Sequence, residues 1–141
     1  MVKDFEDLAI YQQSRALAKQ VYQITKVEPF KSDYRFVQQI RASSGSISDN
    51  IAEGFERQGT KETKNFMYIA KGSCGELRSQ INRAYDAEWI DAENYKQMYE
   101  DCRKLAVGIN HFIQSLKLTD YDGARYSKNP IQPNPTDSNP F

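Results

Sequence analysis

Residues that break helices are rare in the first 129 positions of this 141-residue chain. Of five prolines only Pro29 precedes residue 130, and glycine occurs seven times in the whole sequence. Because a proline inside a helix costs about 3 kcal/mol, its absence permits long uninterrupted helices. No segment of appreciable length alternates polar and apolar residues with the period of two that predicts a strand. The sequence therefore favours an all-helical fold.

Cysteine and histidine are equally scarce, which excludes several kinds of site. Two cysteines, Cys74 and Cys102, are too few for a disulfide framework and fit a reducing compartment. Di-iron sites in helical bundles need Glu-x-x-His pairs, but the residue three positions before the single histidine, His111, is Gly108. Cys74 with His111 is the one conceivable thiol–imidazole pair, and Cys102 occupies a core-like position. With neither a Gly-x-Ser-x-Gly elbow nor a phosphate-binding loop, we expect no metal, no cofactor, no small-molecule substrate and no catalysis.

Long apolar runs and an excess of one charge are also missing. No run approaches the roughly 20 residues that span a bilayer, and the acidic start of the chain does not resemble a secretory signal. We therefore expect a cytoplasmic protein with no membrane partner. Nineteen basic and nineteen acidic side chains cancel, but residues 31–83 carry nine basic and six acidic groups, against four and six in residues 84–117. Any anion-binding face should lie in the middle of the chain.

Four segments carry apolar residues at alternating spacings of three and four, which is typical of one face of an amphipathic helix. They span residues 10–24, 37–55, 66–84 and 95–116. The last segment is the most regular, with Tyr95, Met98, Cys102, Leu105, Ile109, Phe112 and Leu116. Short connections force successive helices to run antiparallel. Residues 1–117 are thus predicted to form an all-α, antiparallel, up-down-up-down four-helix bundle.

The composition changes after Lys117. Residues 118–141 contain four prolines, and Asn-Pro occurs at 129–130, 134–135 and 139–140. Such a stretch buries too little apolar surface to offset its chain entropy. It is predicted to be a flexible C-terminal tail.

Beside the apolar stripes, the second and third segments each carry a polar seam at helical spacing. The seam of the second segment is Ser43, Ser46, Asn50, Glu53 and Arg57, and that of the third is Asn65, Ile69, Gly72, Glu76, Ser79 and Arg83. Small side chains between Asn, Glu and Arg favour a surface on which another helix packs closely. Packing within the chain and contact between subunits both explain the seams, and both interpretations remain open.

The third segment also carries a basic stripe. Lys64, Lys71, Arg78 and Tyr85 are spaced by seven residues, with Lys61 nearby. Basic groups in line with an aromatic side chain are typical of a phosphate-binding surface, although solvated lysines produce the same pattern. Lys61, Lys64, Lys71 and Arg78 are therefore the candidate nucleic-acid-binding residues.

Two passages resemble the signature of a known family. Residues 39–57 contain Asn-Ile-Ala-Glu-Gly at 50–54 followed by Arg57, and residues 70–77 read Ala-Lys-Gly-Ser-Cys-Gly-Glu-Leu. With Phe-Glu-Asp-Leu at 5–8, these motifs resemble the four-helix bundle family encoded in 23S rRNA intervening sequences, over roughly residues 4–117. The matching signature positions are Asn50, Glu53, Gly54, Arg57, Gly72, Ser73 and Glu76.

The resemblance implies a left-handed antiparallel bundle that assembles as a cyclic homopentamer. It also implies kinship with the accessory variability proteins of diversity-generating retroelements, which bind nucleic acid and a reverse transcriptase through a basic surface. Those relatives are strongly basic, whereas this chain is neutral. We therefore expect a non-catalytic homo-oligomeric scaffold that binds RNA or a nucleic-acid-processing partner weakly. The alternative is a protein–protein adaptor without affinity for nucleic acid.

Overall fold

Four long helices account for most of residues 2–125, the part of the chain that the computed structural model describes, with side chains described up to residue 117. They are α1 (Ala9–Thr25), α2 (Tyr34–Glu56), α3 (Thr60–Asp86) and α4 (Ala92–Arg125). Two short 3-10 helices, η1 (Phe5–Asp7) and η2 (Phe30–Ser32), precede α1 and α2. Within residues 2–125 no strand is present, as the sequence predicts.

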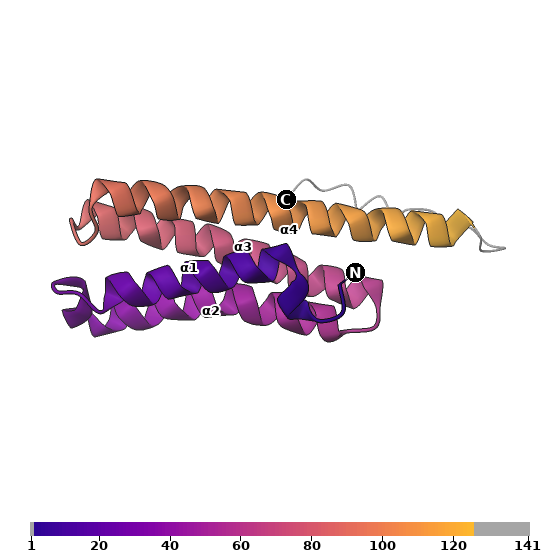
Figure 1. The fold of residues 1–141 in the computed structure, drawn as a ribbon, viewed down its shortest axis with the longest axis horizontal. Helices are drawn as coiled ribbons and strands as arrows, with labels where there is room; N and C mark the ends of the chain where they lie inside the picture. The colour runs from indigo at the N-terminus through magenta and orange to yellow at the C-terminus, as the bar shows by residue number, and fades with distance from the viewer. Residues whose placement is uncertain (1, 126–141) are drawn as a thin grey trace.

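The helices form an up-and-down bundle, which confirms the predicted fold class (Figure 1). Each of α1 and α3 packs against both α2 and α4. The last turns of α4 extend past the ends of the other helices (Figure 1). Helix α4 thus continues to Arg125, inside the segment 118–141 that we predicted to be a tail. Residues 126–141 of that segment lie outside the described residues.

Short polar residues fix where the helices begin. The Asp33 carboxylate accepts a hydrogen bond of 3.0 Å from the Phe36 backbone N–H and caps α2. Asp91 accepts in the same way from the backbone N–H of Asn94 at 2.7 Å, at the start of α4. Asp4 caps η1, and the residue that precedes α1 is Leu8.

The turn after α3 depends on one residue in the left-handed region. Glu88 has a φ of 62°, and its N–H donates to the Tyr85 carbonyl, while the Trp89 N–H reaches back to the Ala84 carbonyl at 2.9 Å. This pair of bonds is the Schellman arrangement that ends many helices. It turns Trp89 onto Phe30 and Phe36, with ring centres 4.9 and 5.8 Å away, and so closes one end of the bundle.

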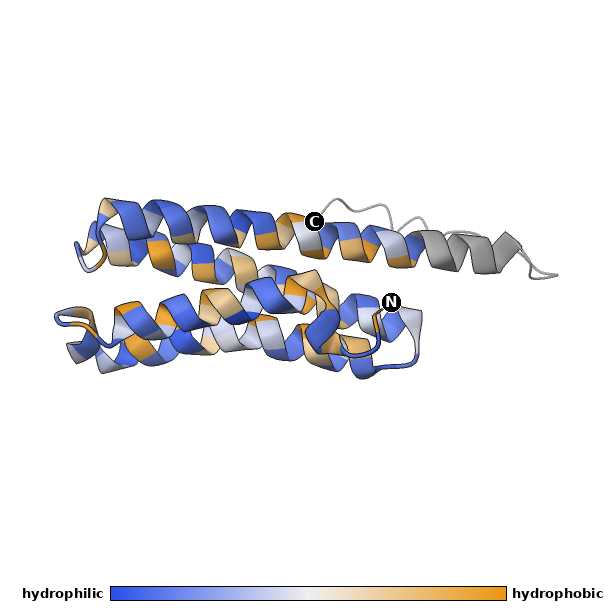
Figure 2. Cartoon of the chain, in the orientation of Figure 1, coloured by the Kyte–Doolittle hydropathy of each residue, from blue (hydrophilic) through white to orange (hydrophobic). Residues whose placement is uncertain are grey.

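The apolar stripes meet in one continuous core. Hydropathy colouring shows the polar residues on the outer sides of the helices and apolar residues between them (Figure 2). The largest fully buried side chains are Phe30, Leu17, Ile40, Ile47, Ile51, Met67, Leu77, Ile81, Met98, Leu105, Ile109 and Ile113. Near the end of α4 the buried position is Ile113, whereas the predicted Phe112 is only partly buried. An α-helix advances 3.6 residues per turn, so a stripe that steps strictly by three and four drifts off the core face.

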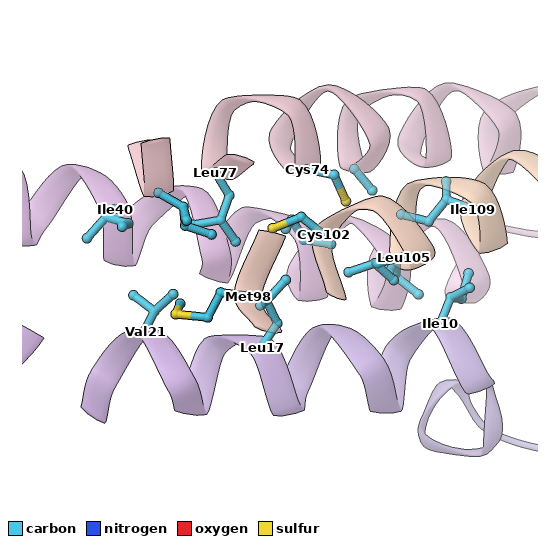
Figure 3. Packing of buried hydrophobic residues seen from close by; sticks show 14 of the residues in the cluster. Ile10, Leu17, Val21, Ile40, Cys74, Leu77, Met98, Cys102, Leu105 and Ile109 are labelled. Atoms are coloured by element: carbon cyan, nitrogen blue, oxygen red, sulfur yellow. The ribbon is translucent and has the colours of Figure 1, made fainter. Parts of the chain in front are cut away.

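Both cysteines are core residues. Cys74 of α3 and Cys102 of α4 are free thiols that point into the core beside Leu77 and Leu105 (Figure 3). Burial raises the pKa of each thiol from its ordinary 9.0 to about 12. Each thiol therefore remains protonated at neutral pH, and a protonated thiol is a poor nucleophile.

Helices α2 and α3 approach each other closely at Gly54. A Cβ atom built on Gly54 would lie 2.9 Å from the Phe66 Cβ and 3.2 Å from the Met67 Cε. The Thr63 hydroxyl donates a buried hydrogen bond of 2.8 Å to the Gly54 carbonyl and joins the two helices at this point. A side chain at position 54 would force the helices apart.

None of the helices within residues 2–125 is both long enough and apolar enough to cross a membrane.

Replacing Gly54 by alanine should destabilise the bundle by about 1–3 kcal/mol, because the methyl group overlaps Phe66 in a region without free space. Chemical denaturation followed by circular dichroism measures this change. Gly45→Ala, in the same helix, is the matched control. A Cβ at Gly45 meets nothing within 4 Å, so its higher helix propensity should raise stability by up to about 1 kcal/mol. Equal effects of the two substitutions would contradict the close contact.

The buried thiols predict a stability that depends on alkaline pH. Because the unfolded thiols ionise near pH 9.0 and the folded ones near pH 12, the free energy of unfolding should fall between these values as pH rises. The maximum slope is about 1.4 kcal/mol per pH unit for each thiol. Denaturation curves at several pH values should show a shallower decline for the Cys74→Ala/Cys102→Ala variant. An unchanged decline would mean that the thiols ionise in the folded state.

Candidate functional site

Helix α3 presents two flanks, one against α2 and one against α4, and the predicted site residues divide between them. The basic stripe lies on the flank toward α4. Lys71 Nζ donates to Asn110 Oδ1 at 3.3 Å, and Arg78 Cζ lies 5.8 Å from the centre of the Tyr99 ring. The stripe therefore contacts α4, whereas the sequence assigned it to a single helical segment.

Contacts further along the same flank define one surface. The Tyr85 and Tyr95 rings stack with centres 4.2 Å apart and planes 12° apart, and the Tyr95 hydroxyl donates to Asn82 Oδ1 at 2.8 Å. At the other end, Lys117 Nζ lies 5.9 Å from the centre of the Tyr68 ring. We call this surface the α3–α4 face. Its residues are Lys61, Lys64, Tyr68, Lys71, Arg78, Asn82, Tyr85, Tyr95, Tyr99, Arg103, Asn110 and Lys117.

Six residues of the α3–α4 face are cationic: Lys61, Lys64, Lys71, Arg78, Arg103 and Lys117. Lys61 and Lys64 extend the row of Lys71 by helical spacing, and Arg103 follows Tyr99 by four residues on α4. On α4, Asp101 accepts a hydrogen bond of 3.0 Å from Gln20 and is thus turned toward α1. A chain that is neutral as a whole therefore concentrates cationic groups on one side.

The signature positions lie in α2, at its C-terminal end and in α3, and three of them are explained by packing within the chain. Asn50 Nδ2 donates to the Ser46 carbonyl at 2.7 Å, and the Ser46 and Ser73 hydroxyls lie 2.9 Å apart across the two helices. Gly54 permits the close approach described above. Asn50, Gly54 and Ser73 thus hold α2 and α3 together.

The other four signature positions face solvent. Arg57 and Glu53 form an ion pair of 2.9 Å within α2, which is exposed and contributes little to stability. Gly72 and Glu76 are exposed on α3, and a Cβ on Gly72 would meet no atom within 4 Å. Packing within the chain therefore does not explain why position 72 is a glycine.

An open depression lies between α2 and α3, and Glu76 forms part of its wall. Its volume is about 530 Å³, and its walls include Gln39, Ser43, Ser46, Glu76, Ser79 and Arg83. Gln80, only 4% exposed, also borders it. The Gln80 Nε2 reaches Glu76 Oε1 at 3.5 Å, but the buried Gln80 Oε1 has no hydrogen-bond partner. Part of each polar seam thus lines one depression, namely Ser43 and Ser46 of α2 and Glu76, Ser79 and Arg83 of α3.

The residues considered for chemistry are not brought together. His111 lies on the exposed side of α4, while Cys74 and Cys102 are buried in the core. Among the described residues, no group of three or more His, Cys, Asp or Glu side chains is arranged to hold a metal ion.

Sequence reasoning missed the contribution of α4 to the basic surface. The axial register between α3 and α4 brings Tyr99, Asn110 and Lys117 next to α3. This register cannot be read from a single sequence. A signal was present, because Tyr99, Arg103, Asn110 and Lys117 follow one another at spacings of four and seven.

Comparisons with known proteins agree with the fold. The chain resembles a crystal structure of a protein of unknown function from the S23 ribosomal protein family of Bacteroides thetaiotaomicron, with a TM-score of 0.68 and 21% sequence identity. The match covers 74% of this chain and 95% of the other. A comparison with curated proteins finds no match. The model of the 23S rRNA-intervening sequence protein family matches residues 6–111. The chain therefore belongs to the 23S rRNA-intervening sequence protein family.

Proposed function

We propose that this protein is a non-catalytic helical scaffold that binds RNA weakly through the α3–α4 face. The observation that supports the proposal is the row of cationic side chains, interleaved with tyrosines, along one side of a neutral protein. Lysine and arginine next to phosphates release condensed counterions, which is the main source of sequence-independent affinity. With few such groups per subunit, each contact is weak and strongly dependent on salt.

Self-association would strengthen this binding. We propose that the polar depression between α2 and α3 is a subunit contact, and that the assembly is the homopentamer implied by the family resemblance. The exposed Gly72 permits close approach of another helix, and the exposed Glu76 and Arg83 can pair across such a contact. A ring would repeat the α3–α4 face once per subunit, so weak sites would add by avidity on a long RNA.

A protein–protein adaptor is the second candidate, and one observation favours it. Ile69, 51% exposed, lies three residues before Gly72 on the rim of the same flank of α3. An apolar side chain beside a polar depression fits a protein partner, such as a nucleic-acid-processing enzyme, as well as it fits a second copy.

Replacing Lys64, Lys71 and Arg78 together with glutamine should weaken RNA binding severalfold or more at about 50 mM salt, because three phosphate contacts per subunit are lost. Fluorescence anisotropy with a labelled RNA, repeated as salt is raised, measures the affinity and its salt dependence. The variant should keep the helicity of the parent, since none of the three side chains belongs to the core cluster.

The matched control replaces Arg15, Lys19 and Lys26 with glutamine. These residues are exposed at or next to α1, and their loss changes the net charge by the same amount. Equal weakening by the two triple variants would contradict a localised site. Failure of the parent protein to bind at about 50 mM salt, where screening is weak, would favour the adaptor.

Gly72→Leu should dissociate the assembly, because leucine fills the space that a second helix would occupy. It should leave the subunit folded, since nothing lies within 4 Å of the added Cβ. Sedimentation velocity at tens of micromolar protein measures the change. Gly75→Leu is the control, because Gly75 is equally exposed and equally open but lies three residues further around α3. A parent protein that sediments as a monomer would refute the subunit contact.

A further inference from the structure

The tyrosines of the α3–α4 face point to the form of RNA that this face binds. We propose that Tyr68 and Tyr85 are stacking platforms for unpaired bases, so that the face binds single-stranded RNA in preference to a duplex. This inference rests on the proposed function, because it assumes that the cationic row holds the phosphates.

Both rings are accessible, although they belong to a polar surface. Tyr68 is 44% exposed and Tyr85 is 39% exposed. The Tyr85 ring already stacks on Tyr95 at 4.2 Å, so a base placed on Tyr85 would extend an existing stack. Packing of α3 on α4 explains the contact between the two rings. This packing does not explain why Tyr68 and Tyr85 remain so exposed to solvent.

The spacing of the rings fits an extended strand. Tyr68 and Tyr85 are separated by 17 residues of one uninterrupted helix, which corresponds to about 26 Å along the axis. Lys71 and Arg78 lie between them in sequence, on the same face. A strand that follows the helix would therefore meet a ring, two cationic groups and a second ring in turn. This combination of a basic track with aromatic platforms is how proteins bind single strands without sequence preference.

Cationic side chains lie next to aromatic rings on the α3–α4 face. Lys117 Nζ lies 5.9 Å from the centre of the Tyr68 ring, and Arg78 Cζ lies 5.8 Å from that of Tyr99. These positions bring positive charge next to ring surfaces, where the phosphate that follows a stacked base would lie. A duplex cannot use the rings, because its bases are already stacked and paired inside the helix.

The experiment compares three labelled probes of equal length, about 20 nucleotides each. They are an oligouridylate, an RNA hairpin and an oligonucleotide with abasic sites in place of bases. The abasic probe retains the phosphates but offers nothing to stack. Fluorescence anisotropy is measured on the full-length parent protein and on Tyr68→Leu/Tyr85→Leu, which retains apolar side chains but loses both rings.

We expect the parent to bind the oligouridylate at least about fivefold more tightly than the abasic probe and the hairpin. The leucine variant should lose at least about fivefold on the oligouridylate and be unchanged on the other two probes. Tyr68→Phe/Tyr85→Phe should restore the parent affinity, because phenylalanine keeps the ring. Tyr34→Leu is the control for loss of an exposed tyrosine elsewhere, since Tyr34 is 77% exposed at the start of α2.

Two results would overturn the inference while the proposed function stands. One is equal affinity of the parent for all three probes, abolished by the Lys64, Lys71 and Arg78 substitutions. The other is a leucine variant that melts at a lower temperature but binds the oligouridylate as the parent does, which would make the tyrosines packing residues only. Failure of the parent to bind any probe would instead overturn the proposed function as well.

Discussion

The close approach of α2 to α3 at Gly54 is the contact on which the rest of the surface depends. Because a Cβ at this position would overlap Phe66, only glycine allows the Thr63 hydroxyl to reach the Gly54 carbonyl. The bridge from Asn50 through Ser46 to Ser73 holds the same two helices further along. Together these contacts fix the orientation of α3. They therefore decide which of its side chains border the depression with α2 and which lie along α4.

The two flanks of α3 carry different kinds of interaction. On the flank toward α2, hydroxyl and amide groups form hydrogen bonds of about 3 Å. The same flank borders the depression, in which the buried Gln80 Oε1 lacks a hydrogen-bond partner. The flank toward α4 combines cations and rings, which act over longer distances and respond to salt. Net neutrality hides this difference, because the total charge of the chain does not show where its cationic side chains lie. The positions of the charged side chains therefore say more about a binding surface of this protein than its net charge does.

Sequence reasoning predicted the fold in most respects, because periodicity reports directly which side of a helix is buried. Ile40, Leu77 and Leu105, which lie in three of the four predicted segments, are fully buried as expected. It did not predict η1, since a 3-10 turn before α1 leaves no apolar signature. The site was predicted less completely. The seams left packing within the chain and contact between subunits open. The hydrogen bonds of Ser46 and Asn50 account for part of the first seam by packing within the chain. Tyr99 and Asn110 could not be paired with α3 without the register of α4.

Helix α3 is a single run of 27 residues without a proline, and this continuity limits how its gene can change in length. Each residue of an α-helix turns the chain by about 100°, so the two flanks of α3 differ only in their angle around the helix axis. A one-residue insertion near Gly72 would rotate every later side chain by that angle, and would carry Arg78 and Tyr85 away from α4. An insertion of seven residues would restore the phase to within about 20°. Evolution of this helix should therefore tolerate many substitutions but very few insertions or deletions.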